Sequence, residues 1–315
     1  MLYHSRIGKS KYGIMGIFKN ILNLFRSVAK DATEPRTPVP KRNLNARLEM
    51  LLTEAAAIDG DTKRLVDVLK EKNVRIFFDF FEDPETTGTA QSATDIDFAA
   101  RHLKATPKKV SIQLNPNLPF AKIIGVFLHE ARHVMQFYSG FFLPPNLTSS
   151  FDAVWLNRVK EADATSFELV KLFKLKLRGT PLPFEANKIL AAWAGWAAVE
   201  KVYAQKPATL ENGYLRAVAF AGWFAGGEKL RASYERNTLT STKDMQAFCT
   251  AQKLDPTGPP LTTAMLEKIG MCGGETFNYL SHLSMPLDDP FFRLNFASEE
   301  MKKIWNETDA KKNSV

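Results

Sequence analysis

Cysteine is scarce in this sequence, and no hydrophobic run is long enough to cross a membrane. The chain has 315 residues but only two cysteines, Cys249 and Cys272, and neither has a partner at CxxC spacing. This scarcity argues against a disulfide-stapled secreted scaffold and against redox chemistry. The longest apolar candidate, residues 189–199, is shorter than the roughly 18 residues of a spanning helix and is typical of a buried one. The chain also lacks the features of a secretory signal. We therefore expect a cytoplasmic, globular protein.

Acidic residues are sparse at the N-terminal end, and this imbalance accounts for most of the net charge. The whole chain carries a formal charge of +8, but residues 1–42 contain nine Lys or Arg residues and only two acids. The remaining chain is therefore nearly neutral. A basic tail on a neutral body does not indicate a nucleic-acid-binding domain, so we expect no nucleic-acid partner.

The N-terminal segment has its own pattern. Between residues 14 and 30, apolar side chains recur every three or four positions with basic residues between them, which predicts an amphipathic basic helix. Such a helix can lie on an anionic membrane surface, dock on a partner or pack on the body of the protein. Residues 31–42 contain three prolines and are typical of an extended linker. We therefore divide the chain into residues 1–42 and a domain of residues 43–315.

The rest of the chain predicts an α+β fold in which helices dominate. A small sheet is expected ahead of the central helix, from strands at 74–81 and 109–114, with a loop or irregular hairpin at 85–94. Asp61 is the expected N-cap of an early helix, Asp152 that of a long one, and Gly226-Gly227 is expected to bend a third. Helices or helical turns are predicted at residues 44–58, 61–72, 119–138, 152–178, 184–205, 210–234, 243–252, 262–269 and 298–306.

The string His129-Glu130-Ala131-Arg132-His133 lies in the predicted helix 119–138. Two histidines four positions apart project from one face of a helix, so both rings can reach one tetrahedral Zn²⁺ ion. Zinc lowers the pKa of a bound water, and Glu130 is placed to take that water's proton as a general base. The pattern predicts one zinc ion per chain, bound by His129 and His133.

Two imidazoles alone hold zinc weakly, so a third protein ligand is expected. Gln136 and Ser139 stand where a metzincin would continue with Gly and His, which excludes that subclass. A glutamate on a following helix is the alternative, and Glu161 fits because the long helix can return beside the first. Asp163 and Glu168 are its rivals; Glu168 shares a helix face with Glu161. A solvated carboxylate paired with Arg158 or Lys160 is the simpler interpretation of Glu161.

These residues resemble a known group of enzymes. The string HEARHVMQ at 129–136, followed by EADA at 161–164, resembles the gluzincin branch of zinc peptidases. More narrowly, it resembles an uncharacterised bacterial metallopeptidase family in which a strand precedes an HExRHxxQ helix and an EADA-like helix follows. The resemblance covers residues 110–168 and implies a zincin-like fold with His129, His133 and Glu161 as ligands and Glu130 as the base. Thr165 stands where well-known gluzincins often have an aspartate that orients a histidine, so that support must come from elsewhere.

Other side chains are candidates for supporting roles. Gln136 is expected to form a hydrogen bond with a ligand, and the strand at 110–114 could bind an extended substrate as a partner strand. Arg132 is expected to pair with a carboxylate, and the aromatic string 137–142 is expected to pack in the core or to line a substrate pocket. His4 and His102 are interpreted as surface residues. The candidate donors to an oxyanion are Tyr203, Tyr214, His282 and Arg132.

The leading hypothesis from the sequence is zinc-dependent hydrolysis of a peptide bond in a peptide or protein substrate. The alternative is a non-catalytic zinc-stabilised interaction protein that docks on a membrane surface or a partner through residues 14–30. A structural zinc site has four protein ligands, whereas a catalytic site keeps one position open, so the number of ligands separates the two.

Overall fold

A computed structural model describes residues 44–81, 87–97, 104–141, 149–179, 194–251, 261–273, 275 and 277–312. The predicted N-terminal helix and linker, His4 and His102 lie outside these ranges, so the division at residue 42 and the role of residues 14–30 stay predictions. In the part of the chain that the structure describes, no helix combines the length and apolar character needed to cross a membrane.

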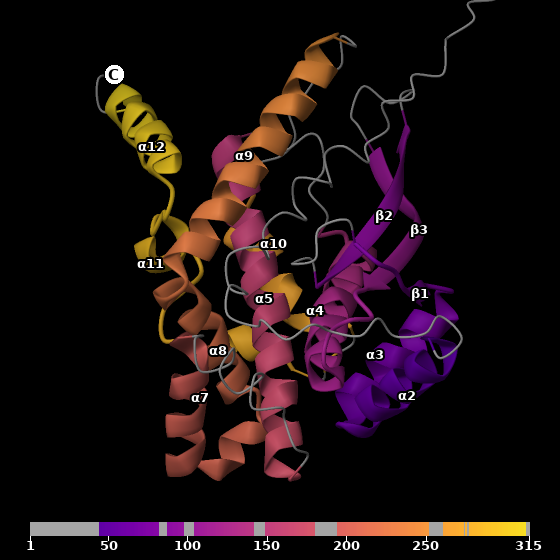
Figure 1. Cartoon of the computed structure of the whole chain (residues 1–315). Helices are drawn as coiled ribbons and strands as arrows, with labels where there is room; N and C mark the ends of the chain where they lie inside the picture. Colours follow the sequence, from indigo (N-terminus) through magenta and orange to yellow (C-terminus); the bar gives the residue numbers. More distant parts are fainter. Residues whose placement is uncertain are drawn as a thin grey trace, which may run out of the picture.

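The described fold is mostly helical with one small sheet, as an α+β fold requires (Figure 1). The strands are β1 (Arg75–Phe78), β2 (Gly88–Asp97) and β3 (Lys104–Leu114). The long helices are α2 (Leu44–Ala57), α3 (Gly60–Glu71), α4 (Phe120–Tyr138), α5 (Ser150–Leu177), α7 (Ala194–Gln205), α8 (Tyr214–Ala225), α9 (Glu228–Ala251) and α12 (Glu299–Lys312). Short helices are η3 (Pro207–Leu210), α10 (Thr263–Glu267), η4 (Lys268–Met271), η5 (Tyr279–His282) and α11 (Pro290–Arg293).

The sheet has the strand order β1-β3-β2, so β3 is its central strand. β1 runs parallel to β3, with Arg75 opposite Ser111 and Phe78 opposite Leu114. β2 runs antiparallel to β3, with Gly88 opposite Leu114, and the register shifts between Ala93 and Thr94. Residues 111–114 are therefore paired on both sides, and the prediction that this stretch receives a substrate strand is wrong. β2 lies at the edge of the sheet instead.

Helix α4 lies between the sheet and α5, which explains its composition (Figure 1). Every side chain from Phe127 to Phe137 is buried, including both histidines of the motif. The apolar members, such as Phe127 and Leu128, belong to the main hydrophobic core together with β3 and α5. A helix enclosed on both sides cannot keep an exposed polar face, so its polar side chains must find partners inside the protein.

Helix α5 is also enclosed, because α4 packs on it from one side and α8 and α9 from another. All residues from Asp152 to Ser166 are buried, although several are charged. The helix begins one residue after Ser149, whose side chain accepts a hydrogen bond from the Asp152 amide. Ser149 is therefore the N-cap, and the prediction that Asp152 has this role is wrong.

Four further predictions differ from the structure. Residues 88–94, expected in a loop or irregular hairpin, form the first part of the continuous strand β2, whose Gly, Thr, Ser and Ala residues are a weak strand signal. The stretch 210–234 is divided between the end of η3, α8 and α9. The break between α8 and α9 falls at Gly226, whose backbone is extended, where a bend at Gly226-Gly227 was predicted. Residues 243–251 of the expected separate helix at 243–252 are the end of α9, and residue 252 lies outside the described ranges. The N-cap of α3 is Asp59, whose carboxylate accepts from the Thr62 amide, and Asp61 lies in the first turn.

Asp59 also ties α3 to α5. Its carboxylate lies 2.6 Å from Lys171 Nζ and 2.9 Å from Lys174 Nζ. Burial alone raises the pKa of Asp59, but the charge of Lys171 and the hydrogen bonds from both lysines outweigh it and hold the pKa well below its usual range. The carboxylate is therefore ionised in the folded protein and anchors the helix that carries Glu161.

We predict that Asp59→Asn, which keeps a capping oxygen but removes the charge, lowers the free energy of unfolding at pH 7 by about 1–3 kcal/mol. Because the folded pKa is depressed, this stabilisation is complete above the unfolded pKa near 4 and is lost as the pH falls below it. Urea unfolding between pH 7 and pH 2.5 measures both effects. Asp67→Asn, which breaks an exposed pair with Lys63, is the control and should change stability by less than about 0.5 kcal/mol. Equal effects of the two variants at pH 7 would contradict the prediction.

Candidate metal centre

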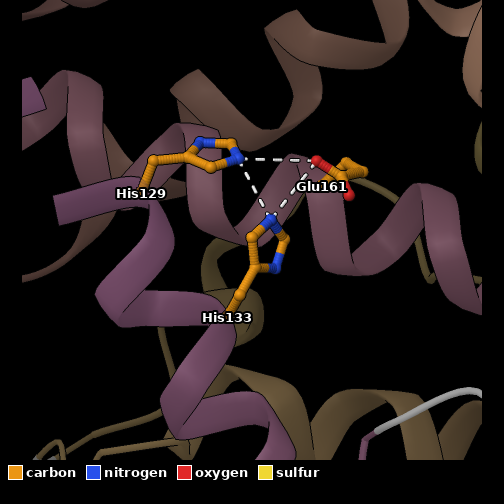
Figure 2. Close-up of side chains that lie close together, drawn as sticks. All are labelled: His129, His133 and Glu161. Carbon is orange, nitrogen blue, oxygen red and sulfur yellow. Dashed lines mark hydrogen bonds and ion pairs between the residues drawn. The ribbon is translucent and has the colours of Figure 1, made fainter. Parts of the chain in front are cut away.

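Three side chains from two helices meet at one point inside the protein (Figure 2). The Nε2 atoms of His129 and His133 lie 3.0 Å apart. Glu161 Oε2 lies 3.5 Å from Nε2 of His129 and 3.4 Å from Nε2 of His133. α4 supplies both rings one turn apart, and α5 packs beside α4 and supplies the carboxylate. All three residues are buried, so Glu161 is not a solvated surface carboxylate.

Gln136 fixes the orientation of the His133 ring. Its amide Nε2 donates to the carbonyl of Lys160 at 2.9 Å and to Asp163 Oδ2 at 2.8 Å. Both partners are acceptors, so the Nε2 end of the amide must point toward them and the Oε1 end toward His133 Nδ1, 2.8 Å away. Nδ1 must then carry the proton of the neutral ring, which leaves a lone pair on Nε2. The expected hydrogen bond of Gln136 is confirmed.

The outer nitrogen of His129, Nδ1, faces a carboxylate, whereas that of His133 faces the amide of Gln136. Glu168 Oε2 lies 3.3 Å from its Nδ1. A carboxylate at Nδ1 favours a proton there, so Nε2 of His129 also directs its lone pair toward the centre of the cluster. Glu168 therefore meets the outer nitrogen of His129, while Glu161 meets the inner one.

The donor set has the chemistry of a cation site. Two imidazole lone pairs and a carboxylate oxygen face one another, and none of them can satisfy the others without a positive charge between them. Burial alone raises the pKa of Glu161, but the two histidines outweigh it and hold that pKa well below its usual range. Burial alone lowers the pKa of His129, but Glu161 and Glu168 raise it well above its usual range. The cluster thus attracts positive charge, and two nitrogens with one oxygen suit Zn²⁺.

Glu130 lies beside this cluster and contacts the edge strand. Its Oε2 accepts a hydrogen bond of 2.7 Å from the backbone N–H of Ala90 in β2. β2 approaches α4 so closely here that a side chain at Gly88 would overlap Val126, which lies one turn before Glu130 on α4. Burial and the neighbouring Glu161 raise the pKa of Glu130, although the two histidines and the Ala90 N–H oppose this. A carboxylate with a raised pKa is a stronger proton acceptor once ionised.

Asp163 is held in a separate buried network. Its carboxylate accepts from Arg132 at 2.7 Å and 3.1 Å, from Arg216 at 2.7 Å and from the Tyr279 hydroxyl at 2.9 Å. Glu275 pairs with the same two arginines. The expected pairing of Arg132 with a carboxylate is confirmed. Because both oxygens of Asp163 are taken by arginines, this carboxylate supports the cluster through Gln136 and does not join it.

The oxyanion donors expected from the sequence lie elsewhere. Tyr203 packs edge-on against Phe173. Tyr214 and His282 are both exposed and contact each other. Arg132 is engaged by Asp163 and Glu275.

Sequence reasoning missed Tyr234, a buried side chain of α9. Burial and the nearby carboxylate of Glu161 raise the pKa of its phenol well above the usual range, so the hydroxyl keeps its proton. No local motif marks this residue, because α9 reaches the site only through the packing of α5 against it.

We predict that the purified chain contains one zinc ion and that Glu161→Ala loses it, because two imidazoles remain without their anionic partner. Elemental analysis after gel filtration measures this directly. Glu200→Ala, which removes an exposed carboxylate of α7, should retain the metal. Equal metal content in the Glu161 and Glu200 variants would remove Glu161 from the ligand set.

The chain is similar to a described protein family. No curated protein and no solved structure matches the chain. Residues 29–278 match a family described as "Putative metallopeptidase family", and this range includes the histidine–glutamate cluster and its supporting network through Glu275. The match extends over most of the 315 residues. The chain therefore belongs to this metallopeptidase family.

Proposed function

We propose that the protein is a zinc-dependent peptidase of the gluzincin type, with His129, His133 and Glu161 as metal ligands and Glu130 as general base. The observation that carries the proposal is the convergence of both Nε2 atoms and the Glu161 oxygen beside a buried carboxylate of raised pKa. Membership of a metallopeptidase family supports the same conclusion.

The described side chains account for ligand binding and proton transfer. A zinc ion held by the two histidines and Glu161 would polarise a water molecule and lower its pKa toward neutrality. Glu130 then accepts a proton at its carboxylate and passes it to the nitrogen of the leaving amine. Tyr234 keeps its proton and its hydroxyl lies beside Glu161, so it would help to orient that ligand carboxylate.

The ligand count favours catalysis over a structural zinc site. Among the described residues, the cluster that could hold a metal has three members. Structural zinc sites are usually closed by four protein ligands, whereas catalytic sites use three and leave a position for water or substrate. The non-catalytic alternative requires a fourth ligand that this cluster does not provide.

The edge strand β2 is the proposed docking site for an extended peptide. The N–H of Ala90 points away from β3, because it donates to Glu130. Strand geometry repeats every two residues, so the backbone groups of Gly88 point the same way. A peptide paired along this edge would present its backbone next to Glu130. The Ala90 N–H has a second role in the proposal, since it holds the base in place.

We predict that Glu130→Gln retains zinc but loses at least about a hundredfold in peptide cleavage, because an amide cannot accept the proton. Digestion of a mixed peptide library, followed by mass spectrometry, measures cleavage at many different peptide bonds at once. Glu200→Gln is the matched control and should cleave like the wild type. Undiminished cleavage by the Glu130 variant, or cleavage that survives removal of the metal, would overturn the proposal.

Replacing Ala90 with proline tests the bond that holds the base. The N–H of Ala90 is not used in the sheet, and proline is tolerated where an edge strand turns its N–H outward. We predict an unchanged fold and zinc content, with kcat/KM reduced about tenfold to a hundredfold, as expected for loss of one hydrogen bond to a charged group. Circular dichroism, metal analysis and the library assay provide the three readouts. Unchanged kcat/KM would show that the Ala90 N–H does not position Glu130.

A further inference from the structure

Helix α5 places two carboxylates on opposite sides of one imidazole ring. Glu161 Oε2 lies 3.5 Å from Nε2 of His129, and Glu168 Oε2 lies 3.3 Å from Nδ1 of the same ring. The two glutamates are seven residues apart and lie on one face of the helix, about two turns from each other. One helix therefore contacts both nitrogens of a histidine that belongs to the neighbouring helix.

The approach of Glu168 depends on the absence of a side chain at Gly125. This residue lies on α4, one turn before His129. A Cβ atom built at Gly125 would come 2.8 Å from Glu168 Oε1 and 3.2 Å from Leu172 Cδ1. The first distance is shorter than a carbon and a carboxylate oxygen tolerate, so the carboxylate would have to move. Glycine destabilises the interior of a helix relative to alanine, so it is unfavourable at this position unless the space is used.

The two histidines therefore have different outer partners. His133 is oriented by the neutral amide of Gln136, at 2.8 Å. Nδ1 of His129 instead faces a carboxylate at the ion-pair distance of 3.3 Å, and the side chain of that carboxylate is only 16% exposed. A carboxylate at Nδ1 fixes the tautomer and ring angle and also makes Nε2 a more basic ligand. In this arrangement the charge of Glu168 is transmitted through the ring of His129.

We propose that Glu168 is a positioning residue of the metal centre, which acts through His129, and that Gly125 provides the space it needs. This inference rests on the proposed function, because it assigns a role toward the metal. Thr165 has no carboxylate with which to orient a ligand histidine. Glu168, one turn further along α5, supplies that carboxylate. It does not replace Glu161, since it faces the outer nitrogen of the ring.

A double-mutant cycle on metal affinity tests the proposal without any substrate. The variants are Gly125→Ala, Glu168→Ala and the double variant, and zinc affinity is measured on the full chain by competition with a chromogenic chelator. Glu168→Ala should weaken zinc binding about tenfold to a hundredfold, the usual loss for an outer partner of a metal ligand. Gly125→Ala should weaken it in the same direction. In the Glu168→Ala background, Gly125→Ala should add no further loss, because its effect runs through the carboxylate.

Two further variants separate positioning from general damage. Glu168→Gln keeps the shape and an oxygen acceptor, so it should bind zinc better than Glu168→Ala and should shift the visible absorption of the Co²⁺-substituted protein relative to the wild type. Gly195→Ala also crowds a helix contact, because its Cβ would come 3.1 Å from the Ala219 carbonyl oxygen and 3.5 Å from Leu169 Cδ1. It does not meet the Glu168 carboxylate, so it should leave zinc affinity unchanged.

The outcomes distinguish this inference from the function on which it rests. If the wild type binds zinc and Glu168→Ala binds it equally well, the role of Glu168 is wrong while the metal site stands. If the losses from Gly125→Ala and Glu168→Ala add independently, the role of Gly125 is wrong. If the wild type binds neither zinc nor Co²⁺, both this inference and the proposed function are overturned.

Discussion

The central constraint of this structure is the meeting of three electron-pair donors in a buried space. Two imidazole nitrogens and a carboxylate oxygen lie 3.0–3.5 Å apart, with their outer atoms held by other groups. Gln136 Oε1 accepts a hydrogen bond from the Nδ1–H of His133, and Glu168 lies at Nδ1 of His129. Donors that face one another in a medium of low polarity repel unless a cation joins them. The packing of α4 against α5 creates this arrangement, and the polar residues around it maintain it.

A network of buried charges keeps that arrangement rigid. Arg132 stands on α4 between the two histidines, and its guanidinium pairs with Asp163, two residues after Glu161 on α5. Arg216 from α8 and Glu275 from the C-terminal part complete the network. Breaking a buried pair by removing one partner usually costs about 3–5 kcal/mol, so these groups hold the two helices in a fixed relation. Gln136 connects the network to His133. The geometry of the centre thus depends on segments far away in the sequence.

Features that depend on local periodicity, such as the extent of a helix and the side chains that share one of its faces, were predictable from the sequence. The motif at residues 129–133 predicted two rings on one helix face, and the helix at 119–138 agrees closely with α4. Long-range packing was not predictable in the same way. β2 is poor in strand-forming residues and exists because β3 pairs with it. Tyr234 follows Glu161 by more than seventy residues and reaches it only through the packing of α9 on α5. Glu168 can reach His129 because Gly125, on the neighbouring helix, leaves room for its carboxylate. A contact of this kind between two helices cannot be predicted from the spacing of residues along the chain.

Anomalous diffraction at the zinc absorption edge, from crystals of the full chain, tests the central claim most directly. The account predicts a single strong peak at about 2.0–2.1 Å from Nε2 of both His129 and His133, with an oxygen of Glu161 in the same coordination sphere. It also predicts that neither Asp163 nor Glu168 touches the metal. A map with no peak between the two rings, or a zinc ion bound by Asp163 or Glu168 in place of Glu161, would contradict it.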